Sequence, residues 1–180
     1  MKRTNNTSAV RYTICCVVLS AQSWGASQAH AQDHAGFDAF FDKVTRAEGE
    51  LFRGHAEPLK ALWSHSPDVT LFGVSGGRGD HGWDQVGRRL DWASTQYSQG
   101  TLTVERIASH VGGNLGYVVQ RERVRFKVPS QSADTTVDIR ATWIFGREQA
   151  GWRIMHRQAD WLMKRVGPAE VKTPAIRPAR

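Results

Sequence analysis

Apolar side chains in the first half of the chain recur at every third or fourth position, the spacing of one helix face. Between Gln32 and Gly54 these positions are Phe37, Phe40, Phe41, Val44, Leu51 and Phe52. They predict a long amphipathic helix that stops near Gly54, because glycine commonly follows the last helical turn. A short second helix is expected over residues 57–67. A third helix, expected to stop at Gly100, carries Trp83, Val86, Leu90, Ala93 and Tyr97.

The second half of the chain alternates apolar and polar residues over long stretches, which predicts β-strands. The stretches are TLTVERIASHV, LGYVVQRERVRFKV, TTVDIRATWIFGRE and GWRIMHRQADWL, separated by turn-forming residues. A further short strand, DVTLFG, lies between the second and third helices. Three helices and a run of antiparallel strands predict an α+β fold, in which helices cover one face of a curved antiparallel sheet.

The first residues bear on where the protein acts. Lys2, Arg3 and Arg11 precede the apolar run ICCVVLSA, and AHA at residues 29–31 supplies an A-x-A cleavage site. This order is typical of a secretory signal peptide, so we expect residues 1–31 to be removed near Ala31 and the mature protein to be periplasmic or secreted. The apolar run is too short for a membrane-spanning helix, and no integral membrane segment is expected.

Composition then excludes several classes of site. Both cysteines, Cys15 and Cys16, lie in the leader, so the mature chain is expected to have no disulfide, thiolate nucleophile or cysteine-ligated zinc. The formal net charge of +7 falls by the three leader cations to +4, which is too small for a nucleic-acid-binding surface. We expect one domain over residues 32–164 and a disordered, basic, proline-rich tail over residues 165–180.

One stretch near the end, GWRIMHRQADW from Gly151 to Trp161, raises a specific question. If it forms a regular strand, one face carries Trp152, Ile154, His156, Gln158 and Asp160. An apolar face that ends in an imidazole, an amide and a carboxylate is either the wall of a pocket or a strand that runs out into water. The pattern alone leaves both interpretations open.

Three segments of the chain resemble a known family: SPDVTLFG, GYVVQRE and DIRATWIFGREQAGWRIMHRQAD. On these motifs the chain is identified as a member of the nuclear transport factor 2-like superfamily, in its SnoaL-like and ketosteroid-isomerase-like branch. The resemblance implies a cone-shaped fold, in which a strongly bent antiparallel sheet wraps around three N-terminal helices and leaves a pocket at its wide end. Many relatives dimerise through the outer sheet face. The family includes isomerases, dehydratases and cyclases, and some of its members have no known activity.

Within such a pocket Asp160 is the candidate general base, because a carboxylate in an apolar cavity is suited to accept a proton near neutral pH. The alternative is a strand-end aspartate that caps a turn or pairs with an arginine. His156 is the candidate group for proton exchange or for holding a ligand oxygen, and the alternative is a core histidine bonded to the backbone. The resemblance places Gln158 where relatives often carry a second histidine, so a two-histidine or metal site is not expected.

The strand YVVQRERVRFKV separates charges by alternation, with Arg121, Arg123, Arg125 and Lys127 on one face. A ladder of four cations needs water, so Glu122 on the opposite face is expected to point inward. Arg140 on the next strand is its expected partner, either in an internal ion pair or in a ligand clamp. Alternation places Arg140 outside the sheet, whereas the resemblance places it in the pocket, and we follow the resemblance.

The sequence therefore predicts a protein that binds a small, largely apolar ligand with an oxygen function. The expected ligand contacts are Trp63, Trp83, Tyr97, Glu122, Arg140 and Gln158. If the protein is an enzyme, we expect cofactor-free isomerisation, dehydration or cyclisation next to a carbonyl, with Asp160 as base and His156 or Arg140 stabilising the oxyanion. The alternative is a non-catalytic ligand-binding or accessory domain. A homodimer is expected, formed through Trp143, Phe145 and other apolar residues of the outer sheet face.

Overall fold

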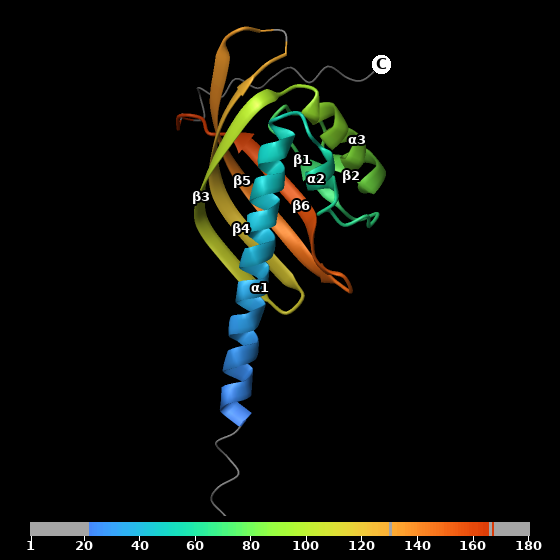
Figure 1. The fold of residues 1–180 in the computed structure, drawn as a ribbon, viewed down its shortest axis with the longest axis vertical. Helices are drawn as coiled ribbons and strands as arrows, with labels where there is room; N and C mark the ends of the chain where they lie inside the picture. Colours follow the sequence, from blue (N-terminus) through green and yellow to red (C-terminus); the bar gives the residue numbers. More distant parts are fainter. Residues whose placement is uncertain (1–21, 130, 166, 168–180) are drawn as a thin grey trace, which may run out of the picture. The chain divides into compact units, whose positions relative to one another are not determined.

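The computed structural model describes residues 22–129, 131–165 and 167. The helices are α1 (Gln22–Leu51), α2 (Glu57–Lys60) and α3 (Trp83–Ser94). The strands are β1 (Thr70–Phe72), β2 (Asp80–His81), β3 (Ser98–Gly112), β4 (Leu115–Lys127), β5 (Asp134–Glu148) and β6 (Gly151–Trp161) (Figure 1). The chain divides into two compact units, residues 1–36 and 37–180, and the second unit is described below. Most of the predicted leader and of the predicted tail lies outside the described residues.

The six strands form one curled, unclosed sheet with the order β2-β1-β6-β5-β4-β3. Neighbouring strands are antiparallel except for β1, which runs parallel to β6 and pairs Thr70 with His156. The predicted α+β fold, with a bent sheet and N-terminal helices, is confirmed. The parallel pairing of β1 departs from a purely antiparallel sheet, and it places the short strand beside β6, the last strand.

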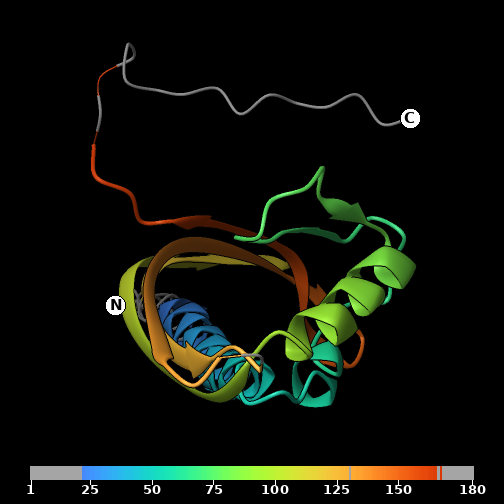
Figure 2. The ribbon, with the colours of Figure 1, turned by 90° about the horizontal axis from the view of Figure 1, so that it is seen from above.

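The concave face of the sheet packs on the second half of α1, from Phe37 onward (Figure 2). The predicted apolar stripe of α1 is buried there: Phe37, Phe40, Phe41, Val44 and Leu51. The ring of Phe37 packs edge-on against Phe145 and Trp152, with centroids 5.3 and 5.2 Å apart. Gly116 makes this contact possible, because a Cβ atom there would lie 2.5 Å from the Phe37 ring. The core therefore forms between the helix stripe and the inward positions of the strands.

The segment after α2 is bonded directly to β6. The backbone N–H of Ser64 donates to Ile154 O, and the Ile154 N–H donates to Leu62 O, both at 2.9 Å. Trp63, between them, is 1% exposed. Val86 and Leu90 on α3 join the same apolar core. These contacts fix α3 and the α2 segment over the end of the sheet where β1 and β6 pair.

A one-residue bulge interrupts the pairing of β5 with β6. Ile144 pairs with His156, but the next residue, Phe145, pairs with Ile154, so Met155 has no counterpart on β5. An extra residue in a strand reverses which side of the sheet the following side chains reach. The inner face of β6 therefore carries Trp152 and Ile154 before the bulge, and Arg157 and Ala159 after it.

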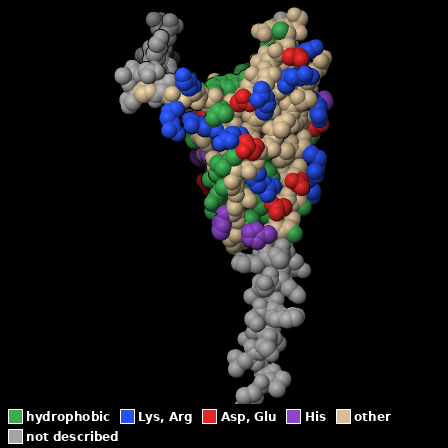
Figure 3. All heavy atoms as spheres, turned by 90° about the vertical axis from the view of Figure 1, so that its left-hand side faces the viewer, with side chains coloured by type: hydrophobic (Ala, Val, Ile, Leu, Met, Phe, Trp, Pro, Cys, Tyr) green, Lys and Arg blue, Asp and Glu red, His purple; other side chains and the backbone are tan. Residues whose placement is uncertain are grey.

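Charged side chains of both signs cover the outer face of β3 and β4. Figure 3 views the side on which β3 lies and shows basic and acidic groups intermixed there. The predicted outward ladder on β4 is confirmed, and each arginine has an acidic neighbour: Arg121 with Glu105, Arg123 with Asp138, and Arg125 with Asp134. Among the described helices, none is long and apolar enough to cross a membrane.

Candidate functional site

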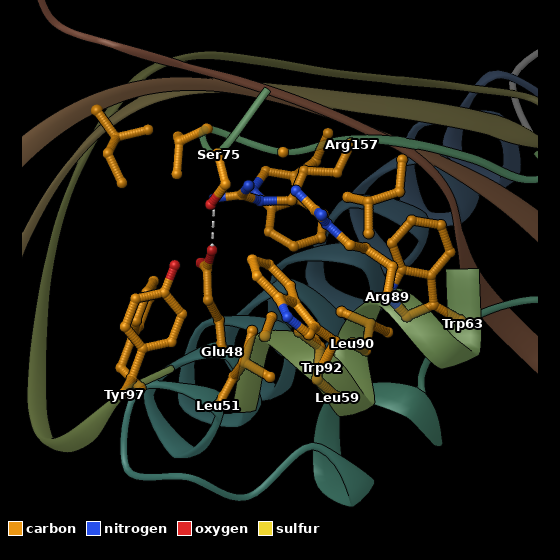
Figure 4. A pocket seen from close by; sticks show the side chains of 17 residues that line it. Glu48, Leu51, Leu59, Trp63, Ser75, Arg89, Leu90, Trp92, Tyr97 and Arg157 are labelled. Carbon is orange, nitrogen blue, oxygen red and sulfur yellow. Dashed lines mark hydrogen bonds and ion pairs between the residues drawn. The ribbon is translucent and has the colours of Figure 1, made fainter. Parts of the chain in front are cut away.

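An apolar cavity lies between α1, α3, the loop after β1 and the inner face of β5 and β6 (Figure 4). Its volume is about 60 Å³. Five aromatic residues of the described chain line it: Phe52, Trp63, Trp92, Tyr97 and Trp143. Aliphatic side chains form most of the remaining wall, and the other polar side chains of the described lining are Glu48, Ser75, Arg89 and Arg157. An apolar chamber with a few polar groups is the usual composition of a small-molecule site.

Three buried charged residues form a cluster at one end of this cavity. The Nη2 atom of Arg157 donates to Glu48 Oε1 at 2.8 Å and to Glu122 Oε2 at 2.7 Å. Gln120 Nε2 donates to Glu122 Oε1 at 2.8 Å. The guanidinium of Arg157 lies 4.9 Å from the ring centroid of Trp143. Because Glu48 and Glu122 are only 2% and 1% exposed, protein groups rather than water hold these carboxyl groups.

Each member of the cluster is positioned by the periodicity of its own element. Glu48 follows Phe41 and Val44 on the stripe of α1 that faces the sheet, at a spacing of three to four residues. Glu122 lies on the inner face of β4, where buried and exposed residues alternate. Arg157 reaches the inner face of β6 because the bulge reverses the alternation. A helix and two strands thus bring their charges to one point.

The electrostatics of the cluster keep a proton on Glu48. The pKa of Glu48 is raised from 4.5 to about 8, first by burial and then by the charge of Glu122, and Arg157 opposes both effects. Burial alone would lower the pKa of Arg157, but the charges of Glu122 and Glu48 outweigh it and raise that pKa. At neutral pH Glu48 is therefore mostly a neutral acid, and a protonated carboxyl group donates a hydrogen bond.

Two hydroxyl groups lie near the Glu48 carboxyl. In Figure 4 the Tyr97 hydroxyl and the Ser75 side chain are directed toward the space beside it. Tyr97 comes from the segment between α3 and β3, and Ser75 from the loop after β1. Because Oε1 of Glu48 accepts from Arg157, its other oxygen is free to carry the proton. The O–H groups of Glu48 and Tyr97 are thus two donors for a ligand oxygen in this space.

The three aromatic residues predicted as pocket walls are found in two places. Trp63 and Tyr97 line the cavity. Trp83 does not, and the expected placement has to be corrected. Its ring stacks on His65 at a centroid distance of 3.9 Å, because the first turn of α3 faces the segment after α2 rather than the cavity.

The predicted polar face of β6 lies on the other side of the sheet, and this too is a correction. His156, Gln158 and Asp160 follow the bulge at Met155, so their side chains are on the outer face. Asp160 is exposed and accepts from Gln158 Nε2 at 3.1 Å. His156 Nδ1 lies 2.7 Å from Thr70 Oγ1, and burial lowers its pKa. None of the three lines the cavity.

Arg140 is also placed outside, which corrects the position that we took from the resemblance. The inner residues of β5 are Ile139, Ala141 and Trp143, and Arg140 between them is exposed. Glu122 points inward as predicted, but its cation is Arg157 rather than Arg140. The alternation of β5 therefore predicted the outward position of Arg140 correctly, whereas the resemblance predicted the wrong side.

The residues that suggested a dimer interface are buried inside the domain. Trp143 and Phe145 are both 0% exposed and belong to the inner core with α1. They face inward because β5 keeps its regular alternation along this stretch. These two side chains therefore do not support the predicted homodimer.

The cavity residues that sequence reasoning did not assign to a site include Glu48, Ser75, Arg89, Trp92 and Arg157. Glu48 had a detectable signal, because a carboxylate occupies a position on the apolar stripe of a helix. Arg157 had none, since a regular strand would have turned it outward. Among the described side chains, no group of three or more His, Cys, Asp or Glu residues is arranged to hold a metal ion.

Comparison with known proteins agrees with this architecture. Residues 37–160 match the model of the SnoaL-like domain family. A nuclear transport factor 2-like superfamily protein from Salmonella enterica is 17% identical with a TM-score of 0.67, covering 79% of this chain and 99% of that one. A ketosteroid isomerase-like protein from Erwinia carotovora is 12% identical with a TM-score of 0.61, covering 72% and 96%.

A candidate scytalone dehydratase from Novosphingobium aromaticivorans is 13% identical with a TM-score of 0.63, covering 85% of this chain and 99% of that one. Among curated proteins, none matches this chain. Identities this low establish a shared fold and leave the chemistry to be argued from the site.

Proposed function

This chain belongs to the SnoaL-like domain family, and we propose that it binds a small, largely apolar molecule by an oxygen atom in the cavity at Glu48. The observation that carries the proposal is a buried carboxyl group at the polar end of an otherwise apolar chamber, where burial raises its pKa to about 8. An uncharged acid donor in apolar surroundings favours an oxygen acceptor, because a buried donor that lacks a hydrogen-bond partner is costly.

Tyr97 supports the same proposal from a second element. Its hydroxyl is directed toward the space beside Glu48 (Figure 4). A tyrosine and a protonated carboxylic acid that donate together to one carbonyl oxygen are a known way to stabilise developing negative charge. In ketosteroid isomerase a tyrosine and a protonated aspartic acid form such a pair. In this cavity Tyr97 and Glu48 would take the two places.

The raised pKa of Glu48, about 8, also favours a catalytic role. A general acid works best when its pKa lies near the working pH. We propose that Glu48 delivers a proton to a carbonyl or departing hydroxyl oxygen of the ligand, and that the resulting Glu48 carboxylate takes up the proton that the ligand loses from carbon. The reaction is then an isomerisation, dehydration or cyclisation that needs no cofactor. Glu48 takes the acid role in the cavity, which Asp160 on the outer face does not reach.

The binding proposal is tested with benzamide, a flat apolar probe with one carbonyl oxygen. Titration is followed through the indole N–H signals of Trp63, Trp92 and Trp143 in ¹H–¹⁵N spectra. We expect saturable shifts in the wild type, affinity lower by about three- to tenfold in Tyr97→Phe, and no binding in Ala93→Trp, which fills the cavity. Arg88→Gln, an exposed change on the same helix, is the control and should bind normally. Unchanged binding by Ala93→Trp would contradict the proposal.

The catalytic proposal is tested on the natural ligand. Native mass spectrometry of wild type purified from its own host should show a bound small molecule that is missing from Ala93→Trp. Glu48→Gln keeps the shape and a hydrogen-bond donor but has no acid proton, so it should bind this molecule and leave it unchanged. Equal turnover by wild type and Glu48→Gln would contradict the acid role, and binding without turnover by either would favour a non-catalytic protein.

We propose in addition that residues 1–31 direct export and that the mature protein forms a homodimer. The order of cations, apolar run and A-x-A site supports export. Exposed apolar side chains on β3 and β4, Ile107, Leu115 and Tyr117, support an association surface. N-terminal sequencing that starts at Met1 would contradict cleavage, and sedimentation equilibrium that gives the mass of one chain would contradict the dimer.

A further inference from the structure

We infer that the ligand of this cavity is an anion, a small apolar carboxylate whose negative group binds the guanidinium of Arg89. The inference rests on the proposed binding function and names the chemical class of the ligand. Arg89 lies on α3, across the cavity from β6, which carries Arg157. Its side chain extends toward the end of the cavity where Ser75 and Arg157 lie (Figure 4). An apolar body with a carboxylate would fill the chamber and meet this cation.

Arg89 is held in position by apolar and backbone contacts. Its guanidinium lies 4.4 Å from the ring centroid of Trp92, one turn further along α3. It also lies against Gly73, where an added Cβ atom would be 3.5 Å from Nη2. The side chain is 22% exposed, so the group is partly shielded but reachable. A guanidinium stacked on an aromatic ring keeps its in-plane N–H groups available for an anion.

The protein partners of Arg89 leave most of its hydrogen-bonding capacity unused. Its Nη2 atom donates to the Gly76 carbonyl at 3.4 Å, at the long end for a hydrogen bond. Its Nε atom lies 3.9 Å from Asp80 Oδ2, a long ion pair between partly exposed groups. A guanidinium has five N–H donors in a planar fork that matches a carboxylate. The fork is therefore largely open on the cavity side.

The charges around the cavity also favour an anion. Arg157 is balanced by Glu122, and Glu48 is the one carboxyl group among the described lining residues. With the proton of Glu48 in place, the charged side chains of the described lining are the two arginines. The carboxylate paired with Arg89 is Asp80, outside the lining, whose Oδ2 lies 3.9 Å from Nε. A carboxylate ligand would supply a closer counter-ion in partly desolvated surroundings, where the attraction is stronger than in water.

A purely structural role for Arg89 would be to tie the loop after β1 to α3, through Gly73 and Gly76. The two roles make different predictions. A loop tie would affect all ligands of the cavity alike, because loosening the loop changes the whole wall. An anion site would affect only charged ligands, so the ratio of two affinities separates the roles even if the variant changes the loop.

Benzoate and benzamide make that ratio measurable, because they share shape and differ in charge at neutral pH. We expect the wild type to bind benzoate at least tenfold more tightly than benzamide, by the indole N–H titration. In Arg89→Gln the preference should fall to about one, with benzamide still bound. Arg88→Gln loses the same charge from the same helix outside the cavity, and should keep the tenfold preference.

The outcomes separate this inference from the proposed function. Equal affinities in the wild type, or a preference that survives in Arg89→Gln, would overturn the anion site while leaving the cavity as a binding site. A preference lost equally in Arg88→Gln and Arg89→Gln would overturn it as well, because the effect would then follow net charge. If neither probe shifts the indole signals of the wild type, both the inference and the proposed function fail.

Discussion

The two faces of β6 carry similar polar groups in opposite surroundings. On the inner face Arg157 is buried and bonded to two carboxyl groups, and one of them, Glu48, holds a proton at neutral pH. On the outer face His156 bonds to Thr70, and Asp160 is exposed beside Gln158. The inner groups depend on one another because water does not reach them, whereas water can replace the partners of the outer ones. Substitutions of the inner groups should therefore change the free energy of unfolding more than substitutions of the outer groups.

The largest effect is expected from Arg157→Met, which removes the central cation. The charged Glu122 would remain buried without a counter-ion, beside the protonated Glu48, and breaking a buried pair in this way costs about 3–5 kcal/mol of the free energy of unfolding. Urea denaturation checks it. The double variant Arg157→Met, Glu122→Gln should recover part of the loss, because it leaves no unpaired charge. A loss below about 1 kcal/mol in the single variant would mean that the cluster is not the buried network seen here.

An intermediate effect is expected in the pH dependence of stability. The pKa of Glu48 in the folded state, about 8, lies above its ordinary value of 4.5. Folding therefore favours the protonated form: the contribution of Glu48 is complete below pH 4.5 and is lost as pH rises toward 8, with a slope of at most about 1.4 kcal/mol per pH unit.

Glu48→Gln isolates this contribution, because glutamine has no proton to lose. Urea denaturation of both proteins from pH 4 to pH 9 measures it. As pH rises, the free energy of unfolding of the wild type should fall relative to that of Glu48→Gln. Parallel curves for the two proteins across that range would contradict the protonation of Glu48.

The smallest effect is expected from Asp160→Asn on the outer face. The side chain is exposed, and its partner Gln158 can bond to asparagine or water instead. The change in the free energy of unfolding should stay within about 0.5 kcal/mol, the range for surface positions. Benzamide binding should also be unchanged. A large loss of binding in Asp160→Asn would restore Asp160 as a residue of the site.

Sequence reasoning succeeded where a single periodicity governs a whole element. The stripe Phe37, Phe41 and Val44 predicted the buried face of α1, and alternation predicted the inward position of Glu122. It failed at β6 because the bulge at Met155 depends on how β5 and β6 pair, which no local pattern reports. Arg140 shows the converse, since its own strand is regular and alternation alone placed it correctly.

The cavity was predictable only in part for the same reason. Trp63 and Tyr97 were expected at its wall and line it, and both lie just beyond the helices whose apolar pattern pointed to them. Arg89 lies between exposed and buried positions of α3, and its place in the cavity depends on the loop after β1, which packs against it from a distant part of the sequence. Contacts of this kind are set by tertiary structure.

The bulge in β6 also has an evolutionary meaning. The pairing at this one bulge decides which alternate set of side chains lines the cavity, without any change in their identity. A strand of the same residues without the bulge would present His156, Gln158 and Asp160 to the interior and turn Arg157 outward. Gain or loss of the bulge in a relative would thus exchange one complete set of pocket chemistry for another, on an otherwise unchanged scaffold.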